Sequence, residues 1–275
     1  MTRTFTQAKV IWLLLGTLVS AMPINNRCLA ATIFVGNQHS IGKYTTAGRT
    51  VRQDLITGLH MPFGIAVEGN RVFVTNENSG TIGEYTTAGR VINARLISGL
   101  NGPAGIVVSG HRLFVANYRA GTIGEYTTSG HPINARLISN LHGPDGIAVV
   151  GNDLLVVNFG SGTIGKYTIT GRALDPVLVS GLAGPNGIAV RGREFFVTND
   201  GSGTIGKYTI GGRVISTTLI GGLRDPFGIA VWRRDLFVVG EYRGGSIGEY
   251  TITGRAINPQ VISDLHYPGF VAVRH

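Results

Sequence analysis

The stretch GTIGEYTT, residues 121–128, decides the fold, because close copies of it recur along the whole chain. Its Ile-Gly pair begins at positions 41, 82, 123, 164, 205 and 247. A second motif, Pro-x-Gly-Ile-Ala-Val or a near variant, recurs in step at Pro62, Pro103, Pro144, Pro185 and Pro226, with a shortened copy at Pro268. A period of this length, built from short apolar runs, is typical of propeller blades or of a solenoid.

Residues 103–143 show one repeat in full. It holds four runs of strand-forming residues, separated by turns that contain glycine. The runs are Ile106–Val108, Leu113–Ala116, Thr122–Thr128 and Ala135–Leu141. The first run is apolar throughout, as in a strand buried on both faces, and the last alternates as an outer strand does. Four antiparallel strands per repeat predict a propeller blade rather than a solenoid coil.

The two ends of the repeat region complement each other. Ile33–Asn37 matches the second strand of a repeat, whereas Phe270–Val273 matches the first. We therefore expect the C-terminal strand to pair with the N-terminal three strands, which leaves no open sheet edge. The sequence predicts an all-β chain with a single six-bladed β-propeller over residues 32–275.

Residues 1–31 lie outside the repeats. Arg3 and Lys9 precede an apolar run, Val10–Met22, and the segment ends in the small residues Ala30 and Ala31. This pattern predicts a cleaved secretory signal peptide, and the run is too short for a membrane-spanning helix. We expect a mature chain without the single cysteine and without a transmembrane segment, exported to the periplasm or the extracellular space.

Charge gives little evidence of a partner. The mature chain carries 21 basic and 15 acidic residues, so its net charge is +6. Basic residues recur in one turn of most repeats: Arg49, Arg90, Arg172, Arg213 and Arg255. One third-strand position carries three positive and three negative side chains, which we interpret as surface charge paired and balanced between neighbouring blades: Lys43, Glu84, Glu125, Lys166, Lys207 and Glu249. Because the charge is spread along the sequence, without the clusters of a nucleic-acid surface, we expect solvated surface, no specific nucleic-acid binding, and a monomer.

The loops that enter each innermost strand should surround the mouth of the central channel. The variable residue of Pro-x-Gly is aromatic on one side and polar on the other: Phe63, Ala104, Asp145, Asn186 and Phe227. A preformed amphipathic concavity is typical of small-ligand sites. Alternatively, Asp and Asn stand there because they suit a turn before glycine.

Two further sets of residues follow the second strand. The first is a near-complete ring of asparagines that either binds a sugar or ion or caps its own turns: Asn37, Asn76, Asn117, Asn158 and Asn199. The second varies between repeats: Glu77, Tyr118, Arg119, Phe159, Asp200, Glu241 and Tyr242. Its acids, Glu77, Asp200 and Glu241, are candidate acid–base groups or simply exposed charge. The candidate ligand-binding residues are Phe63, Asn117, Tyr118, Asn158, Asn186, Phe227 and Tyr242.

The pattern GPxGIAVxGxxLFVxNxxxGTIGxYT resembles the NHL repeat and the related senescence-marker, gluconolactonase and strictosidine-synthase group of six-bladed propellers. It is also similar to self-similar secreted bacterial repeat proteins that carry GTIGEYTTSG and GIAVSG units. The resemblance covers residues 32–275 and implies the fold. Lactonase-type relatives hold one divalent cation, usually calcium or zinc, through a Glu with Asn and Asp at the starts of innermost strands. Asp145 and Asn186 match two such positions, but no Glu stands at the others.

The sequence favours a secreted, non-catalytic propeller that binds a ligand or a protein or glycan partner on its loop-bearing face. The sequence has no G-x-S-x-G elbow on a strand-to-helix turn and no histidine zinc motif. Two alternatives remain open at this point. One is a metal-dependent hydrolase or lyase of the lactonase type, and the other is a structural envelope or matrix protein.

Overall fold

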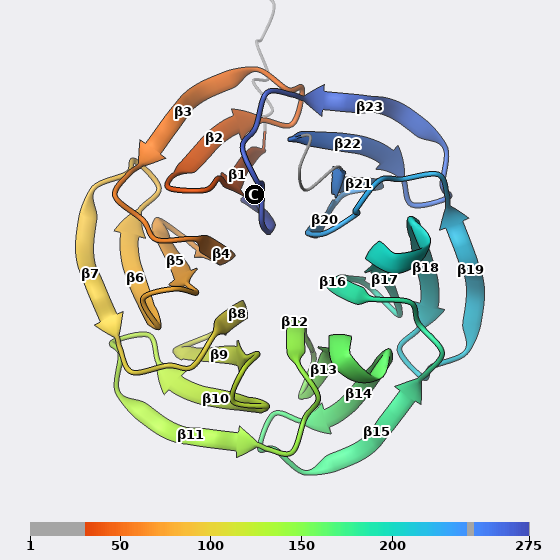
Figure 1. The fold of residues 1–275 in the computed structure, drawn as a ribbon, viewed down its shortest axis with the longest axis horizontal. Coiled ribbons are helices and arrows are strands. Elements are labelled where there is room, and N and C mark those ends of the chain that lie inside the picture. Colours follow the sequence, from red (N-terminus) through yellow and green to blue (C-terminus); the bar gives the residue numbers. More distant parts are fainter. Residues whose placement is uncertain (1–30, 241–244, 275) are drawn as a thin grey trace, which may run out of the picture.

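The computed structural model describes residues 31–240 and 245–274. The predicted signal peptide, apart from Ala31, lies outside them and stays a prediction. Twenty-four strands form six four-stranded antiparallel sheets, arranged as blades around a central channel (Figure 1). The predicted six-bladed all-β propeller is therefore confirmed.

Each blade is numbered here in the order in which its outermost strand occurs in the chain. Blade 1 contains β24 (Val271–Arg274), β1 (Thr32–Gly36), β2 (Ile41–Thr45) and β3 (Thr50–Ile56). Blade 2 contains β4 (Pro62–Glu68), β5 (Arg71–Asn76), β6 (Thr81–Thr86) and β7 (Val91–Ile97). Blade 3 contains β8 (Pro103–Ser109), β9 (Arg112–Asn117), β10 (Thr122–Thr127) and β11 (Pro132–Ile138).

The other three blades repeat this order from the channel outward. Blade 4 contains β12 (Pro144–Val150), β13 (Asp153–Asn158), β14 (Thr163–Thr168) and β15 (Ala173–Val179). Blade 5 contains β16 (Pro185–Arg191), β17 (Glu194–Asn199), β18 (Thr204–Thr209) and β19 (Val214–Ile220). Blade 6 contains β20 (Ile229–Trp232), β21 (Asp235–Gly240), β22 (Ser246–Thr251) and β23 (Ala256–Ile262).

Short 3-10 turns follow the second strands of blades 4 and 5, at η1 (Phe159–Ser161) and η2 (Asp200–Ser202). Within the described residues, the structure has no helix with the length and apolar character that crossing a membrane requires.

Ring closure follows the prediction from the chain ends. Strand β24 pairs antiparallel with β1, and Ile33 lies opposite Val273. Ile33 and Val35 of blade 1 share a buried cluster with Phe237 of blade 6. The C-terminus accordingly lies beside β1 near the channel (Figure 1). This pairing gives blade 1 its fourth strand and covers the β1 edge with backbone hydrogen bonds.

The hydrophobic core lies between neighbouring blades. Phe34 and Ile41 of blade 1, for example, pack in one cluster with Val72 and Tyr85 of blade 2. The Gly-x-Tyr of each third strand fits this packing, because the tyrosine ring folds back over the glycine. A Cβ at Gly124 would lie only 2.7 Å from the Tyr126 ring, so a side chain there would displace the tyrosine.

Among the described residues, the third-strand charges form no ion pairs between blades, contrary to the expectation from sequence. The ion pairs that these third-strand residues form join the second and third strands of one blade, as in Arg71–Glu84 at 2.6 Å and Lys207–Glu194 at 2.9 Å. The reason is the register: β5 runs antiparallel to β6, so the first residues of β5 lie beside the last of β6. Lys43, by contrast, donates to the carbonyl of Thr87 in the next blade.

Candidate functional site at the channel mouth

The Pro-x-Gly motif builds the channel mouth. The pairing of the first two strands shifts register between Pro144 and Ile147, a bulge that blades 2, 3 and 5 share. Bulges of this kind re-aim a side chain. The glycine allows the next blade to pack closely, since a Cβ at Gly146 would lie 2.4 Å from the carbonyl oxygen of Asn186. The motif thus brings the variable residues of successive blades together around the axis.

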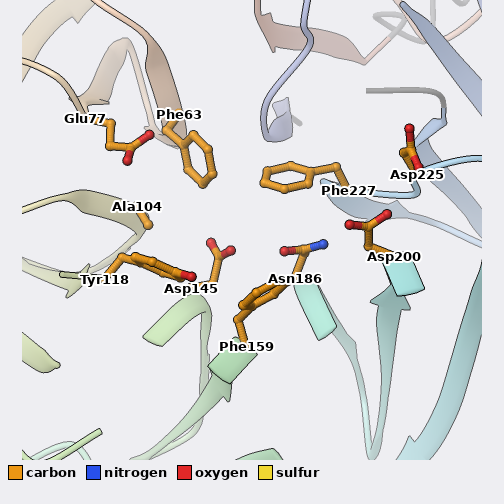
Figure 2. A pocket seen from close by; sticks show the side chains of 10 residues that line it. All are labelled: Phe63, Glu77, Ala104, Tyr118, Asp145, Phe159, Asn186, Asp200, Asp225 and Phe227. Atoms are coloured by element: carbon orange, nitrogen blue, oxygen red, sulfur yellow. The ribbon is translucent and has the colours of Figure 1, made fainter. Parts of the chain in front are cut away.

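A cavity of about 560 Å³ lies at this mouth and is called the mouth cavity below. Its walls are drawn in Figure 2 and come from blades 2 to 6, at the starts of first strands and in the turns after second strands. The lining residues are Phe63, Glu77, Ala104, Tyr118, Asp145, Phe159, Asn186, Asp200, Asp225 and Phe227.

Asp145 is the most deeply buried acid of the mouth cavity. Its side chain is 3% exposed, and its Oδ1 atom has no hydrogen-bond partner among the described residues. Burial raises the pKa of Asp145 well above the usual range, and the negative charge of Glu77 raises it further. Both effects favour the protonated form of Asp145, whose O–H can donate a hydrogen bond.

Glu77 supplies a charged carboxylate beside that neutral carboxyl. It accepts from Arg119 of blade 3 at 2.8 Å, so an ion pair between blades 2 and 3 fixes its position. Both acid side chains point into the cavity (Figure 2). Two carboxyl groups whose environments favour different protonation states are a typical acid–base arrangement. Glu77 and Asp145 are called the carboxyl pair below.

Aromatic side chains form the apolar parts of the wall. The rings of Phe63 and Phe227 meet edge to face at 5.1 Å, and Phe270 packs against each of them at 5.6 Å. On the other side, the rings of Tyr118 and Phe159 lie 6.1 Å apart. Burial raises the pKa of Tyr118, and the negative charge of Glu77 adds to this effect, so its phenol keeps its proton.

Asp200 and Asp225 stand near each other on the blade 5 and blade 6 side (Figure 2). Burial, and then the charge of Asp225, raise the pKa of Asp200. Asn186, 1% exposed, lies between this side and Asp145, and its Nδ2 donates to the carbonyl of Gly184 at 3.4 Å. The polar wall therefore combines four carboxyl groups with one amide.

Most residues selected from sequence meet in the mouth cavity. These are Phe63, Glu77, Ala104, Tyr118, Asp145, Phe159, Asn186, Asp200 and Phe227. Arg119 is connected to the mouth cavity by its ion pair with Glu77. Glu241 and Tyr242 fall outside the described residues, and their suggested roles stay predictions.

Asn117 and Asn158 do not line the cavity. Each is buried, and its Nδ2 donates to a threonine hydroxyl at 3.3 Å, that of Thr122 or Thr163. The carbonyl Oδ1 atoms of these asparagines have no partner among the described residues. The expected capping of backbone amides is thus replaced by a contact with a side chain five residues later in the chain.

Sequence reasoning missed Asp225 and Phe270. Each residue stands at a position where the chain departs from its repeat. Blades 3 to 5 have glycine before the motif proline, whereas blade 6 has Asp225. Phe270 follows the last copy of the motif, which is shortened.

The donors present do not make a convincing cation site. Among the described residues, no three His, Cys, Asp or Glu side chains lie close enough together to hold a metal ion. Calcium takes six to eight oxygen ligands, and Asp145 and Asn186 offer only a beginning of such a set. The hypothesis of a calcium or zinc ion at these residues stays a prediction, and no step below depends on it.

Comparison with known proteins follows from this fold and site. The family model described as the Virginiamycin B lyase family matches residues 29–263. The chain belongs to the Virginiamycin B lyase family. The resemblance to six-bladed propellers therefore predicted the fold correctly. The family that matches is the Virginiamycin B lyase family. No curated protein matches the chain.

Solved structures agree with the fold that the lyase family implies. A propeller in the crystal structure of a nidogen/laminin complex matches with a TM-score of 0.76 at 15% identity, over 88% of this chain and 98% of that one. Virginiamycin B lyase from Staphylococcus aureus matches with a TM-score of 0.59 at 22% identity, over 74% of this chain and 71% of that one. A catalytically inactive form of that enzyme, in which alanine replaces a histidine, was solved with quinupristin and matches with the same TM-score at 23% identity. These likenesses concern the fold.

Proposed function

We propose that the mouth cavity is the active site of a lyase that acts on an amphipathic molecule containing a carbonyl group. The observation that carries the proposal is the carboxyl pair: a buried Asp145, whose raised pKa favours its protonated form, faces the same cavity as Glu77, which Arg119 holds in place. Membership of the Virginiamycin B lyase family supports a lyase over the non-catalytic binding favoured by the sequence alone.

The carboxyl pair suits an elimination reaction. In this proposal the Glu77 carboxylate removes a proton from the carbon next to the substrate carbonyl. The electrons of that C–H bond form a double bond to the next carbon, the one farther from the carbonyl. An oxygen on that second carbon leaves with the electrons of its C–O bond. The proton held by Glu77 then passes to the leaving group or to water.

Asp145 has a different role in the same step. Its O–H donates to the substrate carbonyl oxygen, where negative charge develops as the proton is removed. A donor preorganised in a buried site stabilises such charge more strongly than water does. The aromatic residues Phe63, Phe227 and Tyr118 would hold the apolar part of the substrate, because a cavity of this kind binds a drug-sized ligand mainly through apolar contact.

The reaction is tested with cyclic depsipeptides such as virginiamycin B and quinupristin, analysed by mass spectrometry. Elimination opens a ring without changing its mass, whereas hydrolysis adds the mass of water. A set of linear esters extends the test to other substrates, and parallel assays with a chelator and with added divalent cations report any metal requirement.

Variants separate the two carboxyl groups. Glu77→Gln is expected to lower kcat/KM by about 10²–10⁴-fold, because the variant lacks the general base. Asp145→Asn keeps a donor and should retain activity within about tenfold, whereas Asp145→Leu should lose about 10²–10³-fold. Asp264→Asn, an exposed acid at the same end but outside the mouth cavity, is the matched control. Equal loss in Asp145→Asn and Asp145→Leu would contradict the donor role.

Non-catalytic binding remains the second candidate, on one observation. The Staphylococcus aureus enzyme has a catalytically inactive form in which alanine replaces a histidine, and no histidine is found among the described residues that line the mouth cavity. Saturable ligand binding by calorimetry, lost in Phe227→Ala and without any product by mass spectrometry, would favour this function over the lyase.

A further inference from the structure

Charge is divided between the two ends of the propeller. Antiparallel strands place the turns between first and second strands, and those between third and fourth strands, at one end of the ring. We call this the basic end. The mouth cavity lies at the other end, which carries the turns between second and third strands.

The turns of the basic end hold arginine and, among the described residues, no acid. Their arginines are Arg49, Arg90, Arg172, Arg193, Arg213, Arg233, Arg234 and Arg255, all exposed. By contrast, the turns of the mouth end hold Glu77, Asp200, Asp225 and Asp264 against Arg119 and Arg224 among the described residues. The spread of charge read from sequence is therefore a concentration in space, because a 41-residue period returns each turn to the same end.

The acids that border the basic end do little to reduce its charge. Most stand at strand ends and within third strands, buried or half-buried, and Asp175 near the start of the outermost strand β15 is exposed. Ion pairs neutralise four of them: Glu84, Glu125, Asp153 and Glu194. The partners in these pairs are Arg71, Arg112, Lys166 and Lys207, all of which lie on strands, so these four acids do not neutralise the arginines of the turns.

Blades 5 and 6 carry the strongest departure from the repeat at this end. Their first turns read Arg191-Gly-Arg193 and Trp232-Arg233-Arg234, where blade 2 has Glu68-Gly-Asn-Arg71. The two turns touch, since Arg191 donates to the carbonyl of Arg233, and the Arg233 guanidinium lies 4.3 Å above the ring of Trp232. A half-buried tryptophan next to arginines is a feature of surfaces that meet the lipid headgroup region.

Apolar side chains also lie beside the arginines. The outermost strands begin directly after the turns, and their first residues include exposed valines and isoleucines: Val51, Val91, Ile92, Ile133, Val214, Ile215 and Ile257. The chain also enters the propeller at this end, because the Ala31 carbonyl accepts from Thr46 in the first of these turns.

We propose that the basic end docks on an anionic lipid surface, with the mouth cavity facing away from it. Turns of five blades, all except blade 3, carry the arginines, so the positive charges are arranged around most of a ring rather than along a track. A ring of cations matches a flat anionic surface, whereas a linear polyanion would meet only some of them at a time. The inference is independent of the proposed lyase activity.

The test is partition onto sedimented vesicles by a chain starting at Ala31, which contains all twenty-four strands. A thermal melt first verifies that each variant is folded. We expect binding to vesicles of phosphatidylserine and phosphatidylcholine, little binding to phosphatidylcholine alone, and release at high salt because surface charges are screened.

Two matched double variants locate the surface. Arg172→Gln with Arg213→Gln removes charge from the basic end, and Arg95→Gln with Arg136→Gln removes the same charge from exposed positions on the outermost strands β7 and β11. The first should weaken partition by about 25-fold, about fivefold per arginine, and the second by less than about twofold. Equal losses, or no binding to anionic vesicles, would overturn the proposal. Binding to soluble RNA or polyphosphate but not to vesicles would overturn the choice of a lipid surface.

Discussion

Arg119 of blade 3 donates to Glu77 of blade 2 across 2.8 Å, so the charged member of the carboxyl pair is held by a neighbouring blade. This contact couples the geometry of the mouth cavity to the packing of two blades. An exposed ion pair of this kind contributes only about 0–1 kcal/mol to stability. Its consequence should therefore be seen in activity and hardly in stability.

Arg119→Gln tests that relationship. We expect kcat/KM to fall by about tenfold, because a misplaced catalytic group reduces the rate strongly, while the free energy of unfolding changes by less than about 1 kcal/mol. Arg95→Gln, an exposed arginine outside the mouth cavity, serves as the control. Unchanged kinetics in Arg119→Gln would mean that Arg119 does not position Glu77.

Asp145→Asn should change stability in a pH-dependent manner. Because the pKa of Asp145 is raised in the folded protein, the unfolded chain releases a proton that the folded chain keeps. Wild-type stability therefore falls as pH rises from about 3.9, the ordinary pKa, to the raised value in the folded protein. Urea denaturation should show the variant to be more stable than wild type at pH 7 and equally stable at pH 3. A wild type that exceeds the variant at pH 7 would show that the carboxyl is stabilised as an anion.

Gly146→Ala tests the packing that brings the mouth residues together. Its Cβ would lie 2.4 Å from a backbone oxygen of Asn186, and we expect a loss of about 1–3 kcal/mol from overpacking. Gly211→Ala is the matched control, because it has an ordinary φ and its Cβ would approach only Thr209, at 3.9 Å. The control should be neutral or stabilised by up to about 1 kcal/mol. Similar unfolding free energies for both variants would contradict the close-approach argument.

Removing residues 268–275 tests ring closure. The deletion takes away β24 and leaves the edge of β1 unpaired, so we expect aggregation and loss of a single cooperative melt. Light scattering during a thermal melt makes both visible. A truncated chain that stays monomeric with an unchanged Tm would show that β24 does not close the ring.

The period of the sequence predicted the fold almost completely, since each repeat had to supply one blade and the chain ends had to share the last. It also predicted most of the mouth, because the variable residue of Pro-x-Gly occupies one position in every blade. The carboxyl pair was not predictable: burial of Asp145, its neighbour Glu77 and the support from Arg119 depend on contacts between blades. The charged basic end escaped notice for the same reason, as Arg172 and Arg213 are distant in sequence yet share one end of the ring.

The central claim is that Asp145 of the carboxyl pair has a raised pKa beside the charge of Glu77, and carbon-13 NMR of aspartate-labelled protein measures this directly. Asp145→Asn identifies the Asp145 carboxyl resonance by its absence. We predict that this resonance titrates well above pH 4 in wild type and at lower pH in Glu77→Gln, where the neighbouring charge is gone. A resonance that titrates near pH 3.9 in both proteins, about the ordinary pKa of aspartate, would contradict the account.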